Sequence, residues 1–221
     1  MKGKFSYYWL LLLIPVLFIG WYFASQKEGS PIRYLSYFGP KTYGEVKDTV
    51  YHSIPDFEFI DQDDRKIDQK SMEGKIYVAE YFFTTCKSIC PVMNDNLKRV
   101  YKEFRNRKDF LILSHTVDPE TDSVPVLKQY ADAHGVNDDR WKFVTGDKKK
   151  LYEIARKGYL LNAEEGNGGE EDFIHTQNFA LIDKEHHIRG FYDGTDSLEI
   201  NRMIQDIRIL LNEYDYRDKN K

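Results

Sequence analysis

The chain contains only two cysteines in 221 residues, Cys86 and Cys90, and they lie four positions apart. A strand-like apolar run at 76–83 precedes them and a helix-like run at 92–104 follows, so both thiols belong to one strand-to-helix turn. Two thiols at such a turn can exchange electrons by forming a disulfide, or they can bind a soft metal ion. We therefore expect the function of the chain to depend on these two sulfur atoms.

The spacing of the cysteines bears on both uses. Residues four apart in a regular helix have Cβ atoms about 5–6 Å apart, whereas a disulfide needs about 3.8 Å. A bridge between Cys86 and Cys90 would therefore be strained and easily reduced, while both sulfur atoms could reach one metal ion. We expect Cys86 to lie at the N-terminus of the helix that follows, where N–H groups and the helix dipole would favour the thiolate that binds metal or attacks a disulfide.

Two thiolates alone do not satisfy zinc or an iron–sulfur cluster, which usually take four protein ligands. One added histidine would give a three-coordinate site. Two thiolates and one histidine would suit Cu(I), and such a set can also bind Cu(II). Among six histidines, His175 precedes a predicted strand at 179–183, at the approach that faces the cysteine turn in a thioredoxin-like sheet. Thioredoxin-type reductases have a cis-proline there, but this chain has no proline after Pro125. The predicted ligands are Cys86, Cys90 and His175.

Other uses of the two cysteines stay open. A plain structural disulfide is common in exported domains. A thiol–disulfide reductase would use Cys86 and Cys90 as a redox pair and would not need His175. A peroxide-scavenging relative of thioredoxin would form a sulfenate on Cys86.

The elements around the turn predict a thioredoxin-like α/β domain, with a mixed central sheet flanked by helices. Alternating residues at 55–60 and 65–67 predict two strands joined by a turn, and the apolar runs at 76–83 and 110–117 predict strands buried on both faces. Shorter strands are expected at 141–144, 179–183 and 188–192. Helices are expected at 92–104, 124–134, 147–157 and 197–214.

The N-terminal segment predicts membrane attachment. Residues 7–24 form an uncharged run of 18, about the length that crosses a bilayer. No small-residue cleavage site follows, so we expect an uncleaved transmembrane anchor at 7–25, after a flank at 1–6. A linker and edge hairpin at 26–53 would lead to the domain at 54–214 and a charged tail at 215–221. The net charge of −4 gives no reason to expect nucleic acid as a partner.

The chain resembles the Sco/SenC family of copper-binding assembly factors for cytochrome c oxidase. The segment at 81–91, YFFTTCKSICP, is similar to the family motif F-T-x-C-x-x-x-C-P, and TVDPETDSVP at 116–125 is similar to V-D-P-x-x-D-T-P. WKFVTG at 141–146 and FIHT at 173–176 also match in order and spacing. The resemblance covers roughly residues 54–211.

This resemblance implies a membrane-tethered thioredoxin fold outside the cytoplasm, on a bacterial periplasmic face in preference to the mitochondrial intermembrane space. It implies copper held by Cys86, Cys90 and His175, and a metallochaperone in place of an enzyme. Such a protein would receive copper from a donor protein and pass it to the dinuclear copper site of a terminal oxidase subunit. Asp118 and Asp122 could contact a partner or support the ligands, but we favour turn capping before the helix at 124. The acidic loop at 164–172 has no predicted role.

Overall fold

The computed structural model describes residues 33–43, 49–161, 174 and 176–220, together with 15, 18, 19, 21 and 22. Residues 34–221 form one compact unit and residues 1–33 another. Within the described residues, no helix combines the length and the hydropathy that crossing a bilayer requires. The predicted anchor at 7–25 lies largely outside the described residues, and the acidic loop at 164–172 lies wholly outside them.

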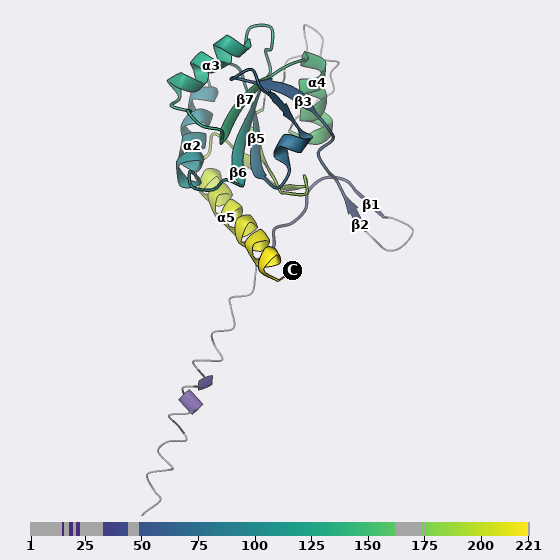
Figure 1. Cartoon of the computed structure of the whole chain (residues 1–221), viewed down its shortest axis with the longest axis vertical. Helices are drawn as coiled ribbons and strands as arrows, with labels where there is room; N and C mark the ends of the chain where they lie inside the picture. Colours follow the sequence, from purple (N-terminus) through teal and green to yellow (C-terminus); the bar gives the residue numbers. More distant parts are fainter. Residues whose placement is uncertain are drawn as a thin grey trace, which may run out of the picture. The chain divides into compact units, whose positions relative to one another are not determined.

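A seven-stranded mixed sheet forms the centre of the larger unit, which confirms the predicted α/β class (Figure 1). Its strands are β3 (Glu58–Asp61), β4 (Lys66–Asp68), β5 (Ile76–Phe82), β6 (Phe110–Thr116), β7 (Trp141–Thr145), β8 (Asn178–Ile182) and β9 (Ile188–Asp193). They lie in the order β4-β3-β7-β6-β5-β8-β9. The three central strands, β7, β6 and β5, are parallel, and the outer strands pair antiparallel to their neighbours. A separate two-stranded sheet is formed by β1 (Lys41–Tyr43) and β2 (Thr49–Tyr51).

The helices follow the predicted order, with different ends. They are α2 (Cys90–Glu103), α3 (Val124–Ala133), α4 (Lys148–Glu153) and α5 (Ser197–Lys219), with a short 3₁₀ helix η1 (Gln69–Met72) and a π-helical turn η2 (Ile154–Gly158). The final helix continues past Tyr214, where we expected a charged tail to begin. It can do so because charged residues suit an exposed helix face, and Arg217 pairs with Glu213 one turn earlier at 2.7 Å.

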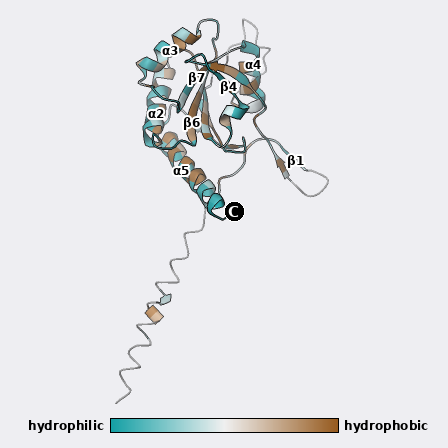
Figure 2. Ribbon diagram, in the orientation of Figure 1, coloured by the Kyte–Doolittle hydropathy of each residue, from teal (hydrophilic) through white to brown (hydrophobic). Residues whose placement is uncertain are grey.

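The central strands separate two hydrophobic cores. Every residue of β5 and β6 is buried, which explains why these runs show no alternation of polar and apolar residues. On one face, Val78 and Phe82 pack with residues of α2, α3 and α5. On the other face, Tyr77 and Tyr81 pack with residues of α4 and η2. Figure 2 shows that the central strands are mostly hydrophobic, whereas hydrophobic and hydrophilic residues alternate along the helices.

A buried ion network joins the end of the sheet to the segment before β1. Arg189 on β9 lies between Asp183 at 2.9 Å and Glu213 at 3.1 Å, and all three side chains are inaccessible to solvent. The Arg189 guanidinium also donates to the backbone carbonyl groups of Leu35 at 2.7 Å and Ser36 at 3.3 Å. Part of the predicted linker therefore packs against the domain.

Candidate functional site

The cysteine turn connects the end of β5 to the start of α2. The backbone N–H of Cys86 donates to the carbonyl of Phe83 at 3.2 Å and closes a tight turn. The helix was expected over 92–104 with Cys86 at its N-terminus, and it begins at Cys90, four residues after Cys86. Pro91 lies in its first turn, where a residue without an N–H is accommodated. Cys86 therefore lies in the loop, and Cys90 is the first residue of α2.

The two thiols are unlike each other. Both are free; Cys86 is partly exposed, whereas only 4% of Cys90 is exposed. Burial raises the pKa of the Cys90 thiol to about 12, and its contact with Cys86 acts in the same direction. Burial alone would also raise the pKa of Cys86, but hydrogen bonds from the Cys90 thiol and from the N–H groups of Cys90 and Ser88 lower it. The pair thus consists of an accessible thiol that ionises readily and a buried thiol that does not.

A small cavity of about 30 Å³ joins the cysteines to the chain before β8. Its lining includes Cys86 and Cys90 and also Ile174 and Thr176. His175 itself lies outside the described residues, but both of its chain neighbours line the cavity of the cysteines. A cavity of this size accommodates a single water molecule or a bare ion.

In the described part of the chain, no cluster of three His, Cys, Asp or Glu side chains could hold a metal ion. The described part of the predicted site therefore consists of Cys86 and Cys90. None of the other five histidines lines the cysteine cavity. His115, for example, is fully buried in β6, its Nδ1 lies 3.2 Å from the carbonyl oxygen of Glu80, and burial lowers its pKa to about 3.

Asp122 has a role that differs from the expected turn cap. Its carboxylate is completely buried and accepts hydrogen bonds from the Thr84 N–H at 3.2 Å, the Thr84 hydroxyl at 2.5 Å and the Thr116 hydroxyl at 2.5 Å. The residue at the N-cap of α3 is Ser123, which makes no side-chain capping bond. Because Thr84 lies two residues before Cys86, Asp122 ties the cysteine loop to the end of β6.

Asp118 shapes the same region through its backbone. Its N–H donates to the Thr116 hydroxyl at 2.9 Å, and its carbonyl accepts from the N–H groups of Thr121 and Asp122. These bonds form the turn that brings Asp122 back toward the loop. Asp118 thus contributes to the turn before α3 through its main chain, whereas we expected it to cap the turn.

Glu80 is a buried carboxyl group that the sequence reasoning missed. It lies on β5, completely inaccessible, and burial raises its pKa to about 8. The Ser114 hydroxyl donates to Glu80 Oε1 and in turn accepts from Trp141 Nε1 at 2.8 Å. Its Oε2 has no hydrogen-bond partner among the described residues. The sequence signal that could have identified it is a charged residue inside the otherwise apolar run at 76–83.

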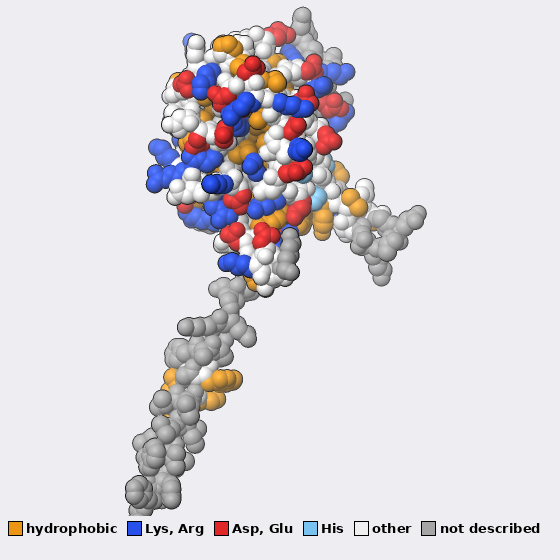
Figure 3. All heavy atoms as spheres, in the orientation of Figure 1, with side chains coloured by type: hydrophobic (Ala, Val, Ile, Leu, Met, Phe, Trp, Pro, Cys, Tyr) orange, Lys and Arg blue, Asp and Glu red, His pale blue; other side chains and the backbone are white. Residues whose placement is uncertain are grey.

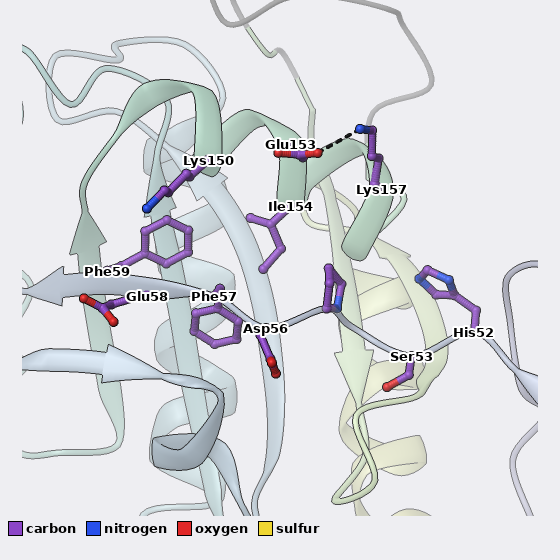
Figure 4. A pocket seen from close by; sticks show the side chains of 11 residues that line it. His52, Ser53, Asp56, Phe57, Glu58, Phe59, Lys150, Glu153, Ile154 and Lys157 are labelled. Carbon is purple, nitrogen blue, oxygen red and sulfur yellow. Dashed lines mark hydrogen bonds and ion pairs between the residues drawn. The ribbon is translucent and has the colours of Figure 1, made fainter.

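A larger cavity, about 770 Å³, lies between the segment before β3 and the α4–η2 region (Figure 4). Phe57, Phe59 and Ile154 form apolar parts of its wall, and Glu153 pairs with Lys157 at 2.8 Å on its rim. Neither cysteine lines it. The size of a cavity therefore does not identify the candidate functional site, which is the smaller cavity lined by the two thiols.

An α/β domain with two free thiols between the first parallel strand and its helix defines a thioredoxin-like protein with a sulfur site. The chain belongs to the SCO1/SenC family, whose model matches residues 46–212. The SCO1 protein homolog of Bacillus subtilis (strain 168) is 28% identical over 166 residues, which cover 74% of this chain and 86% of that relative.

Two further comparisons bear on the site. A protein of Stutzerimonas stutzeri, named as a candidate copper-binding protein, is 24% identical, and the match covers 62% of this chain and 68% of that protein. Among solved structures, BsSco is a member of the Sco family of cytochrome c oxidase assembly proteins in which a disulfide switch has been identified. It is 27% identical, with a TM-score of 0.61, and the match covers 72% of this chain and 93% of BsSco.

Proposed function

We propose that this protein binds one copper ion through Cys86, Cys90 and His175 and delivers it to the dinuclear copper site of a terminal oxidase subunit. One observation carries the proposal: the two thiols share a small cavity with Ile174 and Thr176, the neighbours of His175. Two soft sulfur donors and an imidazole match the preferences of copper. Membership of the SCO1/SenC family supports the same cargo and the same route.

Ligand exchange explains how such a site could release a tightly held ion. A thiolate of the acceptor would form a new bond to copper as the bond to Cys86 breaks, and the oxidation state would not change. Cys86 suits this first step because it is partly exposed, whereas Cys90 is buried and would hold the ion longer. Copper would therefore pass between the proteins without becoming a free ion.

The proposed setting is a membrane surface outside the cytoplasm, supported by the uncharged run at 7–24. A periplasmic location would place the domain beside an oxidase subunit and a copper donor protein. Protease added to intact spheroplasts should digest the domain at 34–221 and leave cytoplasmic proteins whole. Digestion only after lysis would contradict this location.

The ligand set is tested by copper titration of the reduced full chain in detergent, with a Cu(I) chelator as competitor. The parent should bind one ion per chain. His175→Asn should weaken Cu(I) binding by about tenfold or more, because an amide is a poor ligand for a soft ion. His186→Asn is the matched control, since His186 lies in the β8–β9 turn with a positive φ that asparagine tolerates. Equal binding by both variants and the parent would show that His175 is not a ligand.

A second candidate function is a thiol–disulfide reductase acting on cysteines of the oxidase subunit or other exported proteins. The asymmetry of the thiols favours it, because an accessible thiol of lowered pKa can attack and a buried thiol can resolve the mixed disulfide. In that step the target disulfide is reduced to two thiols as Cys86 and Cys90 are oxidised to a disulfide. Turnover of a model disulfide by His175→Asn without copper would favour the reductase.

A further inference from the structure

A second cavity, with a volume of about 720 Å³, opens at the end of the sheet opposite the cysteine loop. Its walls come from β4, η1, the loop between α2 and β6, and the first residues of β6 and β7. The parallel strands β5, β6 and β7 all begin there, whereas Cys86 follows the last residue of β5. The seven residues of β5 correspond to about 20 Å of extended strand. The cavity is therefore separate from the thiol site.

Most of the ionisable side chains that line this cavity are cationic, although the chain has a net charge of −4. Eight cationic side chains and one carboxylate line it: Arg65, Lys66, Lys75, Arg105, Arg107, Lys108, Arg140 and Lys142, with Asp139. In Figure 3, Lys and Arg side chains lie close together at the lower left of this face, where Figure 1 shows the lower end of α2. Five of the eight cations already pair with carboxylates, namely Arg65, Lys66, Arg107, Arg140 and Lys142.

Three of the cations have no ion-pair partner among the residues that the structure describes. Within the described part of the chain, Lys75, Arg105 and Lys108 make no ion pair and no side-chain hydrogen bond. Asp139, the one carboxylate among the described residues of the wall, already pairs with Lys142 at 2.6 Å and with Arg65 at 2.8 Å. Like charges that share one concave wall repel one another, so an anion placed among them would be attracted by all three.

We propose that this cavity binds a phosphate-bearing anion. Guanidinium groups bind phosphate oxygens as planar forks, and ammonium groups bind them as point charges. Asn106 lines the same cavity, and its side-chain amide can donate further hydrogen bonds. The volume is that of a small-molecule site, so the ligand is a diphosphate or the headgroup of an anionic phospholipid, which share the same phosphate chemistry. This inference does not depend on copper binding by the cysteine loop.

The test compares two triple variants of the full chain in a neutral detergent. In the cavity variant, K75Q/R105Q/K108Q, three unpaired cations become neutral. Loss of their mutual repulsion should leave its Tm equal to or above that of the parent. The control variant, K41Q/K149Q/K219Q, removes the same charge from exposed residues that do not line the cavity. Calorimetric titration with inorganic pyrophosphate at about 0.1 M salt should show that the affinity falls about tenfold or more in the cavity variant alone.

Two further probes identify the source of the phosphate. Dihexanoyl phosphatidylglycerol, below its micelle-forming concentration, represents the lipid headgroup, and citrate represents a carboxylate anion of similar charge. Tighter binding of pyrophosphate assigns the cavity to free phosphates, tighter binding of the lipid assigns it to headgroups, and both results support the proposal. The proposal is overturned if the parent binds neither phosphate probe, if citrate binds as tightly as the better one, or if both triple variants lose affinity equally. Copper binding should be unchanged in both variants, which separates this test from that of the cysteine site.

Discussion

The carboxylate of Asp122 holds both the N–H and the hydroxyl of Thr84, a residue 38 positions earlier in the chain. This contact ties the loop that presents Cys86 to the end of β6, because the same carboxylate also accepts from the Thr116 hydroxyl. It explains how a thiol in a loop can keep a defined position next to a thiol at the start of a helix.

Replacement of Asp122 by Asn should disturb the cysteine loop. One carboxylate oxygen would become an NH₂ donor facing the donors of Thr84 and Thr116, at a cost of about 1–3 kcal/mol in the free energy of unfolding. We expect copper to bind with the same stoichiometry and lower affinity, and the Thr84 amide to exchange hydrogen faster. Glu120→Gln, in the same connection but exposed, is the control and should match the parent. Unchanged copper affinity in folded Asp122→Asn would show that the site does not need this tether.

The two cysteines should differ in their rate of alkylation. Cys86 is partly exposed and Cys90 is 4% exposed, so iodoacetamide should modify Cys86 first in the reduced, copper-free protein. The lowered pKa of Cys86 and the raised pKa of Cys90 act in the same direction. Peptide mass spectrometry after timed quenching measures both rates, and in urea the rates should become similar. Equal rates in the folded protein would contradict the observed burial.

Glu80 should make the stability of the protein depend on pH. Its pKa is about 8 in the folded protein against an ordinary value of 4.5, so the folded state binds the extra proton between these values. The free energy of unfolding should therefore fall as the pH rises from about 4.5 to 8, by an amount on the order of a few kcal/mol. Glu80→Gln should lack this contribution. The free energy of unfolding, measured by urea unfolding, should therefore differ between parent and variant by an amount that changes across this pH window. A difference independent of pH would mean that Glu80 is not protonated in the fold.

Loss of Arg189 should destabilise the domain strongly. Arg189→Met would leave Asp183 and Glu213 as buried carboxylates without a cation, which typically costs about 3–5 kcal/mol. The segment containing Leu35 would also lose its anchor, so hydrogen exchange of residues 35–38 should become faster. Arg202→Met is the matched control, because Arg202 pairs with Glu199 on an exposed helix surface. Its effect should stay within about 1 kcal/mol.

The sequence predicted the features that depend on local pattern. The central strands are apolar throughout because both faces are buried, so the runs that became β5 and β6 were recognisable. The position of the cysteines between β5 and α2 was predictable because a strand-like run precedes them and a helix-like run follows. Helix α2 begins two residues before the predicted start at 92, with Pro91 in its first turn, so Cys86 lies in the loop before the helix.

Contacts between distant parts of the chain were not predictable from pattern alone. Asp122 lies in a segment whose sequence is typical of the start of a helix. No neighbouring residue indicates that its hydrogen-bond partner is Thr84. Ser114 and Trp141, which form the buried polar chain with Glu80, come from two other strands. The cationic cavity is likewise assembled from separate segments, each of which reads as an ordinary solvated surface.

The segment before the domain also protects the sheet from self-association. An exposed edge strand offers unpaired N–H and C=O groups to another molecule. Here the N–H of Phe38 donates to the carbonyl of Ile188 at 2.9 Å, and Ser53 bridges to His187, so residues before 54 occupy part of the free edge of β9. A shortened protein that began at residue 54 would lose this cover, and its copies would be prone to pair edge to edge and aggregate. Protein beginning at residue 34 would keep the cover and stay monodisperse.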